Sequence, residues 1–99
     1  MNRAPKTHYL KCHAQPFQAV VDGSKKAELR YNDRDYQQGD SLVLQEWDPL
    51  LQRHSGRQVE AVVSHVIDVD QWRTPVTPRT GMVVLSLHDT RFGHFTPGE

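Results

Sequence analysis

The long segment Gln58–Asp68 is rich in valine and isoleucine, which favour extended backbone. Its eleven residues exceed the usual length of a strand, so we expect a bent or bulged strand. A second apolar segment, Met82–Leu87, is too hydrophobic for an exposed sheet edge, and we expect it inside the sheet. These two segments commit the chain to a β-rich fold.

Shorter strands are expected before this long run. His8–Cys12 is a short mixed segment that fits a strand, and Ser41–Asp48 alternates between two sets of side chains. Residues 32–40 between them, with sequence NDRDYQQGD, consist of turn-forming residues, and we interpret Gly39-Asp40 there as turn chemistry and not as a phosphate loop.

The segment Ala27–Tyr31, with sequence AELRY, also alternates and is predicted to be a strand with one charged face. Leu29 and Tyr31 share one face, while Glu28 and Arg30 share the other. Because the first face is apolar, we expect Tyr31 to belong to the core.

One helix is expected near the N-terminus, at Pro16–Asp22. Proline suits the first helical turn, and Phe17, Val20 and Val21 recur at the spacing of one buried face. Gly23 follows the last periodic residue and should end the helix. Five to six strands with one short helix predict an α+β fold, in which a helix packs on a small β-barrel.

A chain of 99 residues has room for one domain, which we expect to span residues 1–88. Residues 70–80 contain two prolines and show no period, so they are expected to form a loop. The segment 89–99 is rich in glycine, proline and polar residues, and we expect a flexible tail there.

Charge is divided unevenly along the chain. Twelve basic and twelve acidic residues cancel, which excludes a protein that coats nucleic acid by bulk positive charge. Residues 1–34, however, carry seven basic against three acidic side chains, whereas residues 35–99 carry five against nine. No lysine follows Lys26. A local basic pocket in the first third is therefore compatible with the neutral total.

The expected environment is the reducing cytoplasm, because the single cysteine, Cys12, has no partner for an internal disulfide. The first 17 residues contain no apolar run of signal-peptide length, and no 18 consecutive apolar residues occur anywhere. We expect a monomer with no membrane partner.

Residues 23–49, together with the preceding LKCHAQPFQAV and the later GMVVLSL, resemble the ASCH superfamily, and most closely its compact bacterial and phage proteins. The matching features occur in order: a lysine on the first strand, a helix ending in glycine, Lys-Lys-x-Glu-Leu-Arg, and Gly-Asp before an apolar strand. The resemblance implies a PUA-like β-barrel whose cleft beside the first helix binds RNA or modified nucleotides. It covers the chain from about His8 to His88.

We expect the binding residues to lie in this matched region, where lysines supply point charges for phosphate and arginines supply forked donors. An acid beside them can orient a cation. The candidate RNA- or nucleotide-binding residues are Lys11, Lys25, Lys26, Glu28, Arg30, Asn32 and Arg34.

Two alternative functions remain open besides binding. The resemblance includes an amidohydrolase of acetylcytidine that uses a lysine, a threonine three residues later and a distant glutamate; here these positions hold Lys25 and Glu28, and no glutamate lies between Glu60 and Glu99. In a nucleoside amidohydrolase or a ribonuclease, Glu28 would be the general base and Lys25 the charge stabiliser. A protein-interaction adaptor would instead use the loops at 47–57 or around Trp72.

Neither a metal nor another cofactor is expected. The six histidines show no HxH, HExxH or mixed histidine and cysteine spacing of the kind that ligates zinc. Among the aromatic residues from which base-stacking groups would come, Trp72 in its proline-containing loop is the least typical of a core.

Overall fold

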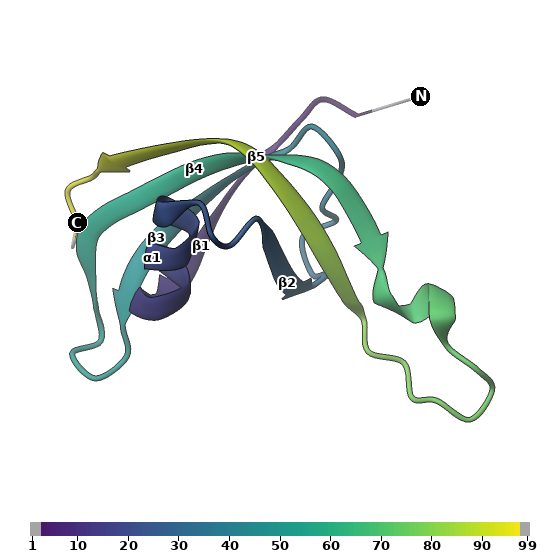
Figure 1. Ribbon diagram of the computed structural model, residues 1–99. Helices are drawn as coiled ribbons and strands as arrows, with labels where there is room; N and C mark the ends of the chain where they lie inside the picture. The colour runs from purple at the N-terminus through teal and green to yellow at the C-terminus, as the bar shows by residue number, and fades with distance from the viewer. Residues whose placement is uncertain (1–2, 98–99) are drawn as a thin grey trace.

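Five strands form a single sheet in the computed structural model, which describes residues 3–97 (Figure 1). The elements in chain order are β1 (Thr7–His13), α1 (Ala14–Asp22), β2 (Ala27–Tyr31), β3 (Ser41–Asp48), β4 (Arg53–Asp68), the 3₁₀ helix η1 (Val69–Trp72) and β5 (Met82–His94).

The strands lie in the order β1-β3-β4-β5-β2, so the first two strands of the chain are the two edges of the sheet. Strands β1 and β3 run parallel, and the other neighbours pair antiparallel. Figure 1 shows that the sheet curls strongly, with α1 on its inner side. A mostly β half-barrel with one short helix near the N-terminus confirms the coarse α+β prediction.

Helix α1 begins two residues before its predicted start and ends, as predicted, before Gly23. Gly23 adopts a φ of 83°, a left-handed conformation that glycine reaches without strain, and its N–H donates to the carbonyl oxygen of Val20 at 3.1 Å. Val20 and Phe17 are the buried residues of the helix, so the predicted apolar face is the one that packs on the sheet.

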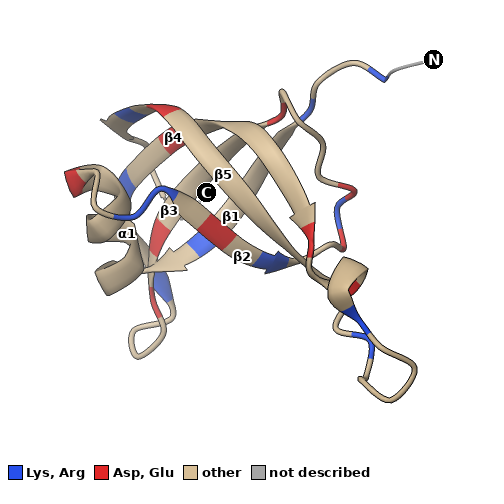
Figure 2. Ribbon diagram, turned by 45° about the vertical axis from the view of Figure 1, so that its right-hand side comes forward, with Lys and Arg blue, Asp and Glu red and all other residues tan. Residues whose placement is uncertain are grey.

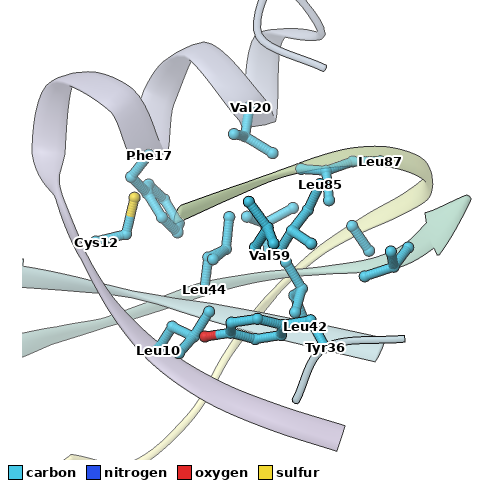
Figure 3. Close-up of a cluster of buried hydrophobic side chains, with 13 residues drawn as sticks. Leu10, Cys12, Phe17, Val20, Tyr36, Leu42, Leu44, Val59, Leu85 and Leu87 are labelled. Atoms are coloured by element: carbon cyan, nitrogen blue, oxygen red, sulfur yellow. The ribbon is translucent and has the colours of Figure 1, made fainter. Parts of the chain in front are cut away.

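The core fills the inside of the curled sheet (Figure 3). Phe17 from α1, Leu44 from β3 and Leu85 from β5 are completely buried there. Burying one such side chain contributes about 1.5–3 kcal/mol, so these contacts fasten the helix to the sheet. The helix is thereby fixed next to the edge strand β1, from which it continues directly.

Strand β4 is the predicted long strand, and its bend is confirmed. Its pairing with β5 shifts register at 60–62 and again at 63–65, which is how a bulged strand follows a curled sheet. The strand begins at Arg53, not at Gln58 as predicted. The residues before Gln58 resemble a turn because they include Gly56, whose φ of 97° is accommodated within the strand.

Strand β5 lies between β4 and β2, inside the sheet as expected, but it does not end at Leu87. The predicted tail from residue 89 is wrong as far as His94, because this segment continues β5 and pairs with β4. The polar residues at 88–91 are exposed. Their polarity therefore reflects the solvent-facing surface of a strand and not a flexible tail. Residues 98 and 99 of the predicted tail lie outside the described part of the chain.

The connection between β4 and β5 begins with η1 and continues without regular structure to residue 81, which agrees with the predicted loop. Asp70 stabilises it by accepting hydrogen bonds from the N–H groups of Thr80 and Gly81, at 2.8 and 2.9 Å. These bonds lower the pKa of Asp70. The loop projects from the barrel in Figure 2 and carries Trp72, which is 68% exposed.

Candidate functional site

Arginine side chains link the two edge strands of the half-barrel, β1 and β2. Arg30 on β2 donates from Nη2 to the carbonyl oxygen of Lys11 on β1 at 3.1 Å. Arg34, three residues after β2, donates from Nη1 to the carbonyl oxygen of Tyr9 at 3.1 Å. Two outer-edge carbonyls of β1 thus accept from guanidinium groups. We call this junction between β1 and β2 the seam.

A cleft of about 460 Å³ opens along the seam, beside the start of α1. Its volume lies in the range of small-ligand sites. We call it the seam cleft. Its charged lining residues are Lys11, Lys25, Glu28 and Arg30, so three cations face one carboxylate and leave a formal charge of +2. Figure 2 shows basic and acidic segments following one another from the loop before β2 along the strand.

Glu28 is the buried centre of this charge cluster, with 4% of its surface exposed. Lys25 contacts its Oε1 through Nζ and also donates to the carbonyl oxygen of Ala27 at 2.5 Å. Arg30 donates to Oε2 from Nε at 3.0 Å and lies within 2.9 Å through Nη2. Both oxygens of the carboxylate therefore have a cationic partner, and this pairing permits its burial.

The burial of Glu28 reverses the predicted faces of β2. Tyr31, which we expected in the core, is 65% exposed, and Leu29 on the same face is 57% exposed. Glu28 and Arg30 point inward instead. Alternation defines the two faces of a strand but does not say which face is buried. The prediction from hydrophobicity took the apolar face of β2 as the buried one, and this is wrong. The charged face wins here because Lys25, from the loop before β2, completes the neutralisation of Glu28. The prediction that Tyr31 belongs to the core is wrong.

Lys11 forms the opposite wall of the seam cleft. It is exposed on β1, and its Nζ lies 3.8 Å from the centroid of the Trp47 ring on the neighbouring strand β3. This cation–π contact orients the ammonium group without neutralising it. Lys11 thus remains an available positive charge, unlike Lys25 and Arg30, which share their charge with Glu28.

The remaining predicted binding residues lie elsewhere. Lys26 is exposed and does not line the seam cleft, although it directly follows Lys25. Asn32 accepts a hydrogen bond from the N–H of Tyr36 at 3.1 Å through its side chain, which stabilises the following turn. Arg34 is held by its contact with Tyr9. The seam cleft therefore brings together Lys11, Lys25, Glu28 and Arg30 from the seven predicted residues.

Six lining residues of the seam cleft were not among the predicted site residues, and two of them, Cys12 and Tyr31, have side chains that bear on its chemistry. Cys12 is buried next to Phe17 (Figure 3), and burial together with the carboxylate of Glu28 raises its pKa to about 11. The alternation of Cys12 with Leu10 on β1 could have indicated that it faces inward. Tyr31 exposes an aromatic ring at the other wall, and only the orientation of β2 reveals it.

A second hollow, of about 780 Å³, lies where the N-terminal segment meets the loop before β3. Its charged lining residues are Arg3, Asp35 and Asp40, so it carries more negative than positive charge. Asp40 is completely buried and already accepts from Arg3, His8 and two backbone N–H groups. This hollow is larger than the seam cleft but offers an anion no free cation, since Arg3 already pairs with Asp40.

Within residues 3–97, no group of three or more His, Cys, Asp or Glu side chains is placed to hold a metal ion. None of the helices in this part of the chain is long and apolar enough to cross a membrane.

The seam cleft has four chemical capacities. Lys11, Lys25 and Arg30 can donate to an anion such as phosphate. The carboxylate of Glu28 can accept a hydrogen bond from an amino group of a ligand. The exposed ring of Tyr31 can stack on an aromatic ligand. An ammonium group in contact with a carboxylate, as in Lys25 and Glu28, also provides a base next to a charge stabiliser.

Comparison with known proteins identifies relatives of this chain. A family model described as "Domain of unknown function (DUF3850)" matches residues 7–87, which include every element except the end of β5. The chain is similar to the "Uncharacterized 12.9 kDa protein in GpA 3'region" of Escherichia phage P2, with 43% identity over 67 residues. This alignment spans 68% of the chain and 60% of the length of the phage protein.

Proposed function

The chain belongs to the DUF3850 family, and we propose that its seam cleft binds RNA or a modified nucleotide. The observation that carries the proposal is the meeting of three cations, one buried carboxylate and one exposed tyrosine ring in a cleft of about 460 Å³. A nucleotide has the matching parts, because it combines a phosphate, an amino-bearing base edge and an aromatic ring.

Each part of the ligand has a partner in the seam cleft. Lys11, whose charge is not shared with an acid, contacts the phosphate first, and Lys25 and Arg30 add further donors. The base stacks on Tyr31, a contact worth about 1–3 kcal/mol. Glu28 accepts from an amino group of the base, which favours cytosine, adenine or guanine over uracil.

The position of the cleft supports the same proposal. The resemblance to the ASCH superfamily implies a nucleotide cleft beside the first helix of a PUA-like barrel, and Pro16 of α1 lines the seam cleft. We propose the PUA-like assignment of the half-barrel together with the binding function. Only a few cations contact phosphate, so the salt dependence of binding is modest.

Neighbouring lysines offer a matched test of this proposal. Lys25→Met removes a cation that lines the cleft, whereas Lys26→Met removes an exposed one that does not. With cytidine monophosphate and a short single-stranded RNA in calorimetric titrations, Lys25→Met should weaken binding about tenfold, and Lys26→Met should leave it unchanged. Equal affinities of the two variants would contradict the proposal.

Lys25→Met also removes a partner of the buried Glu28, so a second variant separates binding from stability. Lys11→Met lies on the opposite wall and touches Trp47, not Glu28. It should lower the affinity and the steepness of its salt dependence while leaving the unfolding temperature within a few degrees of the wild type.

The contact between Lys25 and Glu28 favours hydrolysis in the same cleft as a second candidate function. In this reaction Glu28 would activate water and Lys25 would stabilise the developing negative charge on the acyl or phosphoryl oxygen. Enzyme in excess over acetylcytidine or RNA should then give product that disappears in Glu28→Gln. Absence of product at enzyme excess would leave binding alone.

A further inference from the structure

We propose that the seam cleft holds one nucleotide of a longer single-stranded RNA, and that a neighbouring base of this RNA stacks in a second site formed by Trp47, His54 and Phe95. This inference rests on the proposed function and names the ligand class more narrowly, as an oligonucleotide.

The second site is a preformed aromatic surface at the hairpin end of the β3–β4 pair, next to the turn that joins the two strands. The rings of Trp47 and His54 meet edge to face with centroids 4.9 Å apart, and those of His54 and Phe95 follow at 5.4 Å. A hollow of about 700 Å³, lined by Trp47, His54, Leu51 and others, lies against the first pair. Edge-to-face packing fixes the rings before a ligand arrives, which lowers the entropic cost of stacking a base.

Lys11 makes this surface continuous with the seam cleft. It lines the seam cleft, and its Nζ lies 3.8 Å from the centroid of Trp47. A phosphate that binds Lys11 is therefore shared between a base on the Tyr31 side and a base on the Trp47 side. Neighbouring strands are about 4.8 Å apart, so the path from β1 across β3 to β4 measures about 10 Å, a span of two or three nucleotides.

Charge distinguishes the roles of the two sites. The charged residues that line the hollow beside Trp47 are Asp48 and Arg53, which balance each other. The carboxylate of Asp48 is also engaged in its own turn, accepting from the N–H groups of Leu50 and Leu51 at 2.9 and 3.1 Å. A neutral aromatic hollow suits a base, whereas the seam cleft with its +2 charge suits the phosphate. The second site should therefore add affinity with little added salt dependence.

The test compares two ligands, cytidine monophosphate and the tetranucleotide of cytidine, by calorimetric titration of the full chain. The wild type should bind the tetranucleotide about tenfold more tightly than the monophosphate. Trp47→Ala should remove this length advantage, measured as the ratio of the two affinities, even if the lost contact with Lys11 also weakens monophosphate binding. Trp47→Phe should restore most of it, because a phenyl ring still stacks.

Trp72→Ala is the matched control, since Trp72 is the other tryptophan of the chain and lines neither hollow. It should leave the length advantage intact. If Trp47→Ala lowers stability, His54→Ala tests the same surface from the neighbouring strand β4 and should reduce the length advantage in the same direction.

The outcomes separate the two proposals. Equal affinity of the wild type for both ligands, or a length advantage that survives Trp47→Ala and His54→Ala, overturns the second site and leaves the seam cleft intact. Loss of the length advantage in Trp72→Ala also overturns it, because the neighbouring base would then lie on the β4–β5 loop. Absence of binding to either ligand overturns the proposed function itself.

Discussion

Among residues 3–97, two acidic residues are buried, Glu28 and Asp40, and they are held in very different ways. Asp40 accepts from the guanidinium group of Arg3, from His8 and from the backbone N–H groups of Lys6 and Gln37. Burial alone would raise its pKa, but these bonds outweigh burial and hold the pKa of Asp40 well below its usual range. Glu28 has only side-chain partners.

This difference separates a structural acid from one that can take part in binding. Backbone N–H groups cannot leave Asp40 without local unfolding, so this carboxylate fixes the N-terminal segment onto the loop before β3. Lys25 and Arg30 are partly exposed at a cleft and can turn toward a ligand without breaking the sheet. Of the two buried acids, Glu28 is therefore the one that fits a functional site, because its cationic partners can move.

Removing the acid of Asp40 should have the largest effect on stability. Asp40→Ala leaves the buried His8 and two N–H groups without an acceptor, which should cost about 3–5 kcal/mol of unfolding free energy. Urea unfolding followed by circular dichroism measures this loss. If Asp40→Ala lowers the unfolding free energy by less than about 1 kcal/mol, Asp40 does not have the structural role that distinguishes it from Glu28.

Acid titration should reveal the same carboxylate. Because the pKa of Asp40 is lowered in the folded state, its contribution is present above the ordinary aspartate pKa of about 3.9 and is lost as the pH falls below it. The wild type should therefore lose stability between about pH 5 and pH 2 more steeply than Asp40→Asn does. Parallel stability curves for the two proteins would contradict this role.

Glu28→Gln should have a smaller effect on stability, of about 1–3 kcal/mol. Its partners Lys25 and Arg30 can reach water when the negative charge is removed, unlike the partners of Asp40. Thermal unfolding measures the change, with the less buried Glu60→Gln as a control expected to shift stability by at most about 0.5 kcal/mol. A loss as large as that of Asp40→Ala would make Glu28 a structural acid as well.

Arg34→Ala should have the smallest effect, of about 0.5–1 kcal/mol. Arg34 is exposed and donates one hydrogen bond across the seam to the carbonyl oxygen of Tyr9. Hydrogen exchange should become faster near Tyr9 on β1 while the centre of the sheet keeps its protection. Uniform protection throughout would show that the arginine does not hold the seam.

Much of the fold could be predicted from local sequence. Strand β2, strand β3 and the end of α1 at Gly23 agree with prediction, because alternation and a helix-ending glycine are local signals. The early start of β4 and the continuation of β5 to His94 were missed, because pairing between these two strands stabilises segments whose composition is polar and turn-like.

The site was only partly predictable for a similar reason. Lys11, Lys25, Glu28 and Arg30 do share one cleft, but the inward direction of Glu28 depends on neutralisation by Lys25 and Arg30. The role of Asp40 was also missed, because its partners Arg3 and His8 lie more than 30 residues away in the chain. From composition alone, Gly39-Asp40 is interpreted as a turn and nothing more.

The most direct test of the central claim is a titration of cytidine monophosphate into ¹⁵N-labelled protein, followed by nuclear magnetic resonance. The account predicts shifts at Lys11–His13 and along β2, including the side-chain Nε of Arg30, with little change at residues 37–41 around Asp40. Shifts around Asp40 without any at the seam, or no shifts at millimolar ligand, would contradict it.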